Sequence, residues 1–115
     1  MNAARLRRRD DITAVRNEGR SVRHTLFAMR ARPNTMAVLR LAVSAPRTLG
    51  RAVKRNRVRR RVREAFRLAA TELASTQGHD VLVVARAAAE GVSASALREA
   101  ARAALAGLAD EARAG

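Results

Sequence analysis

The sequence has no cysteine, tryptophan or tyrosine, and its only phenylalanines are Phe27 and Phe66. Without cysteine the chain forms no disulfide and no thiolate metal site, and a reducing compartment is permitted. It also lacks the rows of aromatic side chains on which common single-strand RNA-binding modules stack bases. Phe66 is expected in the core, whereas Phe27 fits either a core position or an exposed stacking position.

Long apolar segments are absent as well. No apolar run approaches the roughly 20 residues that a membrane-spanning helix needs. The N-terminal segment MNAARLRRRDD is basic, but no apolar segment follows it, so it does not have the pattern of a signal peptide. We therefore expect a cytoplasmic protein.

Acidic residues are few, and basic residues are abundant. The 115 residues include 24 Lys and Arg but only 10 Asp and Glu, a formal net charge of +14, and Lys54 is the single lysine. The first 67 residues carry 20 basic and 4 acidic side chains, whereas residues 68–115 carry 4 and 6. Such a charge repels itself unless a polyanion neutralises it. The first part of the chain is therefore expected to bind nucleic acid, with an anionic membrane surface as the other physical option.

Turn residues and periodicity predict one α+β domain over residues 1–115. A basic flexible arm is expected at residues 1–9. A short helix follows, with Asp10 and Asp11 as its caps and Gly19 at its end.

Two strands are expected before the longest helix, at residues 22–31 and 36–43, with a turn at 32–35 and a loop at 44–50. Residues 80–85 are continuously apolar after Asp80, as in a buried central strand. A last helix begins after Ser93 or Ser95. Its apolar positions are Leu97, Ala101, Leu105 and Leu108.

The longest predicted helix covers residues 52–75 and divides into two faces. Its apolar residues recur at helical spacing and are expected to pack on the sheet: Val58, Val62, Phe66, Ala69 and Leu73. Nine basic residues lie within residues 50–67. At roughly 100° per residue, four polar residues share one flank: Asn56, Arg60, Arg63 and Arg67. Because a guanidinium fork bonds two phosphate oxygens at once, this helix is predicted to bind a polyanion.

Residues that would support protein-based nuclease chemistry are not grouped in the sequence. His24 is expected on a strand and His79 in a turn, and nothing places them together. The acidic residues show no spacing typical of metal ligands. We expect no catalytic residue and no metal bound by the protein alone.

Residues 50–67, GRAVKRNRVRRRVREAFR, are similar to the signature of the bacterial ribonuclease P protein family. The resemblance rests on the string R-N-R-x-x-R-R-x-R-E-x-F-R, which begins at Arg55, and on the preceding G-x-A-V. Weaker similarities flank it, including Arg5-Leu-Arg near the start and the segment Asp80-Val-Leu-Val-Val-Ala-Arg86. The chain thus resembles this family over about residues 5–110.

The resemblance implies a fold that the pattern alone does not give. This is a single-domain α-β-β-β-α-β-α sandwich with a mixed four-stranded sheet and a left-handed βαβ crossover, a fold shared with a domain of a ribosomal protein. The third strand before the long helix comes from the resemblance, because the pattern predicts only two. A left-handed crossover is also unexpected on general grounds.

The resemblance also implies a function. In this family a catalytic RNA removes the 5′ leader of precursor tRNA with Mg²⁺, which the RNA mainly binds, and the protein binds both the RNA and the leader. One protein per RNA is expected, with no membrane partner. The RNA-binding residues carried over are Arg47, Arg51, Lys54, Arg55, Asn56, Arg57, Arg59, Arg60, Arg61, Arg63 and Arg67.

The leader-binding cleft departs from the family pattern. The resemblance places it between the first helix, the sheet and the basic helix, with Ile12, Arg16, Phe27 and Arg30 as its residues. Two positions on the first helix that are usually aromatic are Ile12 and Arg16 here, and a third, often tyrosine, is Arg30. The cleft is therefore predicted to be more electrostatic than usual, since each phosphate contact adds roughly 0.7 to the salt-dependence slope.

Three other functions are compatible with a basic domain of this size. The first is another small RNA-binding or ribosome-associated protein without a nuclease role. The second is a DNA-binding protein that uses the long helix in a groove, although no paired helix-turn-helix or heptad repeat is visible. The third is an autonomous endonuclease, which lacks candidate catalytic residues.

Overall fold

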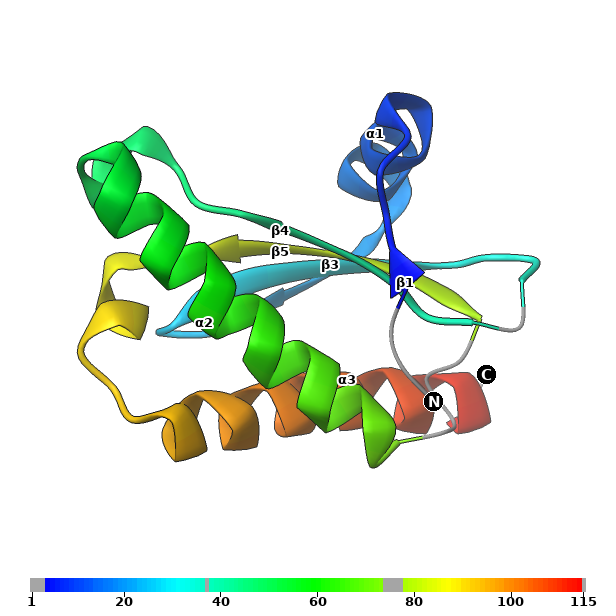
Figure 1. The fold of residues 1–115 in the computed structure, drawn as a ribbon. Helices are drawn as coiled ribbons and strands as arrows, with labels where there is room; N and C mark the ends of the chain where they lie inside the picture. The colour runs from blue at the N-terminus through cyan, green and yellow to red at the C-terminus, as the bar shows by residue number, and fades with distance from the viewer. Residues whose placement is uncertain (1–3, 37, 74–77, 115) are drawn as a thin grey trace.

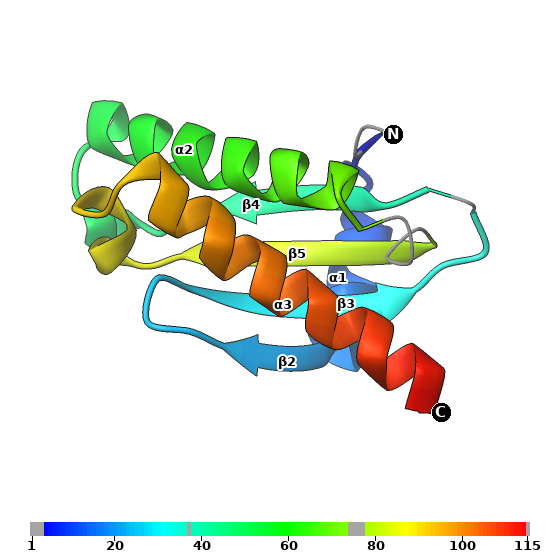
Figure 2. The ribbon, with the colours of Figure 1, turned by 90° about the horizontal axis from the view of Figure 1, so that it is seen from below.

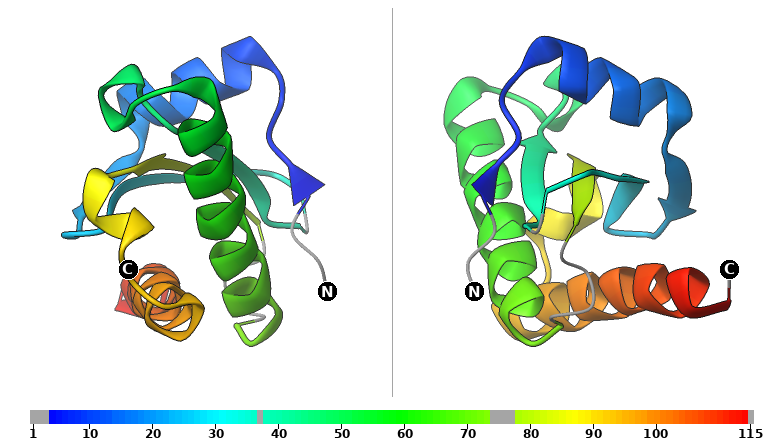
Figure 3. Two further views of the ribbon diagram at one scale, coloured as in Figure 1. Left: turned by 60° about the vertical axis from the view of Figure 1, so that its left-hand side comes forward. Right: turned by 90° about the vertical axis from the view of Figure 1, so that its right-hand side faces the viewer.

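The computed structural model describes residues 4–36, 38–73 and 78–114, with side chains through residue 108. Its elements, in chain order, are β1 (Ala4–Arg5), α1 (Arg9–Glu18), β2 (Arg20–Arg23), β3 (Phe27–Pro33), β4 (Arg40–Ser44), η1 (Arg47–Leu49), α2 (Ala52–Thr71), β5 (His79–Ala85), η3 (Ala87–Glu90) and α3 (Ala94–Ala114). One sheet separates α1 on one face from α2 and α3 on the other (Figures 1 and 3). No helix in the described ranges is both long and apolar enough to span a bilayer.

The sheet has five strands in the order β1-β4-β5-β3-β2. β4 pairs in parallel with β1 and β5, whereas β3 pairs antiparallel with β5 and β2. The mixed sheet and the order of the main elements confirm the expected fold class. The strand number differs, because the two-residue strand β1 adds a fifth strand at the β4 edge.

The connection from β4 through α2 to β5 is left-handed, as the resemblance implied. Figure 2 looks onto the face that carries α2 and α3. With β4 and β5 turned to point upward in this view, the chain leaves β4, crosses in front through α2 and enters β5 on the left of β4. The crossover places α2 beside the β1 edge of the sheet.

The strand predicted at residues 22–31 is in fact a hairpin of β2 and β3, and it supplies the third strand before α2. The turn contains neither glycine nor proline. Its shape comes from His24, whose backbone N–H donates to the Phe27 carbonyl at 2.9 Å and whose Nδ1 accepts from the Leu26 N–H at 3.0 Å. A side chain that binds its own turn gives no strong sequence signal, which explains the wrong prediction.

β4 begins at Arg40 rather than at Met36, and the predicted turn at 32–35 is displaced because β3 continues to Pro33. Asn34 organises the loop between them. Its Oδ1 accepts from the Met36 N–H at 2.9 Å, and its Nδ2 donates to the Val38 carbonyl at 3.3 Å. These bonds occupy backbone groups that a longer strand would need.

The predicted caps of α1 are only partly right. Arg8 is the N-cap and makes no side-chain cap bond, so Asp10 and Asp11 lie in the first turn, where their charge still favours the helix dipole. Gly19 ends the helix as predicted. A Cβ at Gly19 would lie 2.4 Å from the Val15 carbonyl oxygen, which excludes any side chain there without a shift of the backbone.

α2 packs on the sheet through the predicted apolar positions, since Val58, Val62, Phe66 and Ala69 are all buried. Burial of each large apolar side chain is worth about 1.5–3 kcal/mol. The helix ends at Thr71, so Leu73, which is half-buried, follows it, and the predicted end at residue 75 lies outside the described residues.

β5 and α3 complete the core. β5 is the middle strand, and residues 80–83 are buried in it, as the continuous apolar run predicted. Of the two candidate caps for α3, Ser93 is the one used, because its Oγ accepts from the Ala96 N–H at 3.1 Å. The predicted apolar positions of α3 are buried: Leu97, Ala101, Leu105 and Leu108.

Candidate nucleic-acid interface

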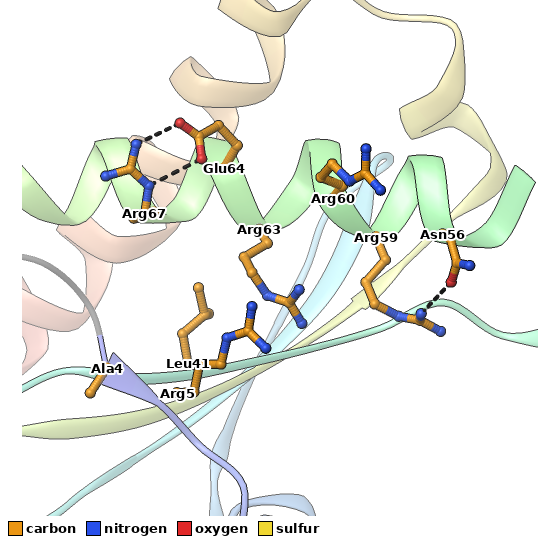
Figure 4. A pocket seen from close by; sticks show the side chains of 9 residues that line it. All are labelled: Ala4, Arg5, Leu41, Asn56, Arg59, Arg60, Arg63, Glu64 and Arg67. Atoms are coloured by element: carbon orange, nitrogen blue, oxygen red, sulfur yellow. Dashed lines mark hydrogen bonds and ion pairs between the residues drawn. The ribbon is translucent and has the colours of Figure 1, made fainter. Parts of the chain in front are cut away.

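A groove of about 440 Å³ lies between β1 and the basic flank of α2 (Figure 4). Its lining includes Arg5 from β1 and four arginines from α2. The full lining is Ala4, Arg5, Leu41, Asn56, Arg59, Arg60, Arg63, Glu64 and Arg67. The flank predicted from helical spacing therefore forms one wall of a cationic groove.

β1 forms the opposite wall, and it is fixed in place by the sheet. The Ala4 N–H donates to the Leu39 carbonyl at 2.8 Å, and the Leu6 N–H donates to the Leu41 carbonyl at 2.9 Å. Leu6 is buried in a small cluster with Val15 under α1. Within the arm predicted at residues 1–9, residues 4–6 are thus paired to the sheet, whereas the side chains of residues 7–9 are exposed.

Arg63 is a partly buried cation of the groove. Burial, and then the nearby charges of Arg5 and Arg59, lower the pKa of Arg63 below its ordinary value. Its Nε is buried and has no hydrogen-bond partner among the described residues. An arginine remains protonated at neutral pH, so the groove contains charge without a matching anion. Figure 4 shows the side chains of Arg5 and Arg63 extending toward each other.

Two contacts organise the remaining side chains of the groove. Glu64 accepts from Arg67 at 2.6 and 3.0 Å, and this interaction lowers the pKa of Glu64 and raises that of Arg67. The Asn56 Oδ1 accepts from Arg59 at 2.7 Å. Asn56 therefore orients an arginine, and only Arg67 of the groove arginines is neutralised by a carboxylate within the described chain.

The basic residues on the opposite flank of α2 make intramolecular contacts. Lys54 and Arg57 each lie 3.0 Å from a carboxylate oxygen of Glu90. Arg61 donates to the carbonyls of Ala89 and Glu90 at 2.8 Å, and also to that of Val92. Three predicted RNA-binding residues thus tie α2 to the η3 turn.

Three more predicted RNA-binding residues lie around the start of α2. Arg47 belongs to η1, and Arg51 is the N-cap of α2; both are exposed. Arg55 is half-buried, and its Nε donates to the Ala45 carbonyl at 2.9 Å. Arg47 and Arg51 therefore extend the basic surface beyond the helix, whereas Arg55 anchors the preceding loop.

The predicted leader-cleft residues do not all share one face. Ile12 packs against the small cluster beneath α1, and Arg30 donates to the Arg16 carbonyl at 2.8 Å. Phe27 is fully buried on the other side of the sheet, where it stacks on His24 and meets Phe66 edge-on, with ring centroids 5.0 Å apart. Phe27 is therefore a core residue and is not available for base stacking. Of the four predicted residues, Ile12, Arg16 and Arg30 lie together on the face of the sheet that carries α1.

Arg5 is the groove arginine that the predicted set of RNA-binding residues omits. A signal for it exists, because Arg5-Leu6-Arg7 alternates in the way of a strand with one buried face. A two-residue strand is too short for that alternation to be recognised. Its position opposite Arg63 depends on pairing with β4, which is far away in sequence.

Comparisons with known proteins identify the family to which the chain is similar. A model of the family Ribonuclease P matches residues 1–109. The ribonuclease P protein component of Clostridium kluyveri is 32% identical over 93 residues, which cover 81% of this chain and 83% of that protein. That of Roseiflexus sp. is 39% identical over 84 residues, covering 73% and 67%.

A solved structure shares the fold. The ribonuclease P protein from Thermotoga maritima superposes with a TM-score of 0.68 at 32% sequence identity, covering 83% of this chain and 88% of that one. The sequence signature, the matched family model and the fold lead to one conclusion: this chain belongs to the ribonuclease P protein family.

Proposed function

We propose that this chain is the protein subunit of a ribonuclease P holoenzyme, and that it binds the catalytic RNA through the groove between β1 and α2. The role in tRNA 5′ processing follows from its family. The observation that carries the binding site is the cluster of Arg5, Arg59 and Arg63, which faces a groove without a carboxylate partner in the described chain. An RNA phosphate supplies the anion that these guanidinium groups lack.

The 5′ leader of precursor tRNA would lie beside α1, on the face of the sheet opposite to the face that α2 and α3 cover. Arg16 and Arg30 are exposed there, and Arg30 is fixed to the end of α1 by its bond to the Arg16 carbonyl. Both described phenylalanines are buried on the other side. The leader would therefore be bound by charge and by guanidinium stacking rather than on aromatic rings.

Mg²⁺ would be bound mainly by the RNA. The described residues contain no group of three or more side chains with suitable metal-ligating atoms. Two of the less exposed carboxylates already bind cations: Asp80 binds Arg40 at 2.6 Å, and Glu90 binds Lys54 at 3.0 Å. The donor set of the described residues does not fit a Mg²⁺ site, so we assign the protein no step through the metal.

The protein's contribution is accordingly the positioning of two RNAs. The groove would bind the catalytic RNA, and the face of the sheet that carries α1 would bind the leader. One small cytoplasmic domain would thus contact both RNA molecules, with one protein per catalytic RNA. Residues 50–67 supply most of the groove. Asp11 and Asp80, two carboxylates that the fold brings together, are both ion-paired to Arg40, and an autonomous nuclease is not favoured.

Reconstitution tests this function. The purified protein is mixed with a bacterial ribonuclease P RNA and precursor tRNA at low Mg²⁺. The proposal predicts faster release of the 5′ leader than with the RNA alone. No stimulation at any protein concentration would reject it, and cleavage without the RNA would indicate a protein nuclease instead.

A further inference from the structure

A second pocket, of about 390 Å³, lies between α2 and the beginning of α3. This volume falls within the range of small-molecule binding pockets. Its lining is Arg60, Arg61, Glu64, Ala65, Leu68, Ala94, Ser95, Leu97 and Arg98. None of the intramolecular contacts described above fills it.

The floor and the rim of this pocket differ in chemistry. Ala65 and Leu97 are buried and Leu68 is half-buried, so the floor is apolar. Arg60 and Arg98 are exposed at the rim, and neither has an ion-pair or hydrogen-bond partner among the described residues. A ligand with a flat, largely apolar group would match the floor, and a negative charge next to that group would match the arginines of the rim.

The pocket adjoins the cationic groove. Arg60 and Glu64 line both, so a single ridge of α2 separates the two spaces. A nucleotide carries a phosphate and a flat base on one sugar, so a strand with its phosphate in the groove can place a base in the adjoining pocket. We propose that this pocket receives an unpaired base of the RNA whose backbone lies in the groove, an inference that rests on the proposed function.

The composition of the chain favours a base over other occupants. Both phenylalanines are buried, so no phenylalanine ring is available to stack a base. A guanidinium plane stacks on a base, and the free rim arginines Arg60 and Arg98 are placed to do so over the apolar floor. The nearby excess of positive charge repels a basic peptide and attracts a polyanion.

Site-directed crosslinking locates the occupant. Because the chain has no cysteine, Ser95→Cys introduces one thiol at the pocket, to which an azidophenacyl group is attached. In the complex with ribonuclease P RNA, it should crosslink to one unpaired nucleotide. Ala96→Cys is the matched control, since Ala96 is equally exposed but does not line the pocket. It should crosslink weakly or elsewhere.

Two glutamate variants then test how much the pocket contributes to the affinity for RNA. Ser95→Glu should weaken RNA binding about tenfold, whereas Ala96→Glu, with the same charge in the same helical turn, should weaken it by less than about threefold. Replacing the crosslinked nucleotide with an abasic one should lower the RNA affinity of the wild-type protein about tenfold. The same replacement should lower the affinity of Ser95→Glu almost no further.

The outcomes separate this inference from the proposed function. If the protein binds the RNA but no crosslink forms at Ser95→Cys, or if the abasic and Ser95→Glu effects simply add, the pocket does not hold a base. Failure of the wild-type protein to bind the RNA at all would reject the proposed function itself.

Discussion

The guanidinium of Arg61 donates a hydrogen bond to the carbonyl oxygen of Ala89 at 2.8 Å, and so ties α2 to the turn that precedes α3. The same guanidinium also binds the carbonyls of Glu90 and Val92. Its neighbour Arg60 is exposed at the edge of the cationic groove. Two adjacent arginines of one signature therefore serve different purposes, one in folding and one at the candidate RNA surface.

Alanine substitution should separate these purposes. Arg61→Ala should lower the free energy of unfolding by about 2 kcal/mol, because hydrogen bonds from a charged group to three carbonyls are lost. Arg60→Ala should change it by less than about 0.5 kcal/mol and should instead weaken RNA binding. Urea unfolding followed by circular dichroism measures both, and equal stability of the two variants would show that the carbonyl contacts contribute nothing.

Glu90 should make the stability of the protein depend on pH. A hydrogen bond from Lys54, and then the neighbouring Arg57, lower the pKa of Glu90 below its ordinary value of 4.5. Because the folded-state pKa lies below the unfolded-state value, the stabilisation is fully present above about pH 4.5 and is lost as pH falls through the folded-state pKa.

The measurement is urea unfolding of the wild type and Glu90→Gln between pH 3 and pH 7. Gln keeps the size of the side chain but removes the titration. The wild type should be the more stable protein at pH 7, and the difference should shrink as the solution becomes more acidic. A difference that stays constant across this range would contradict the assignment.

Leader binding should depend steeply on salt. Arg16 and Arg30 occupy positions that are aromatic in the family pattern, so phosphate contacts would replace stacking. Each phosphate contact adds about 0.7 to the slope of log affinity against log salt. The holoenzyme affinity for precursor tRNA, relative to mature tRNA, should fall more steeply than in an aromatic-bearing relative, and Arg16→Ala should lower the slope by about 0.7. Equal slopes for the wild type, Arg16→Ala and the aromatic-bearing relative would refute this prediction.

Local patterns predicted the parts of the fold that depend on local forces. Helical spacing placed Val58, Val62 and Phe66 on the buried stripe of α2, since any helix on a sheet must bury one face. Ser93 was one of two candidate caps, and the structure selects it. The hairpin at His24 was not predicted, because its turn is stabilised by one side chain rather than by glycine or proline.

The candidate site was harder to predict than the fold, because contacts distant in sequence define it. Spacing alone identified Arg60 and Arg63 on one flank of α2. It could not show that Arg5 of β1 faces them across the groove, or that Arg61 donates to the carbonyls of a turn 28 residues later. Phe27 alternates with Met29 as a strand residue does, yet only the packed sheet shows which face is buried.

The affinity of the protein for ribonuclease P RNA, measured across salt concentrations for Arg5→Ala, Arg63→Ala and their double variant, tests the central claim most directly. Arg102→Ala is the matched control, since it removes one exposed arginine of α3 that lies outside the groove. Each groove variant should bind the RNA about tenfold more weakly, and its slope of log affinity against log salt should be smaller by about 0.7–0.9. If Arg5 and Arg63 bind the same phosphate, the double variant should lose less affinity than the product of the two single losses. Arg102→Ala should retain nearly wild-type affinity. If Arg5→Ala and Arg63→Ala bind the RNA no more weakly than Arg102→Ala, the groove between β1 and α2 is not the RNA-binding site.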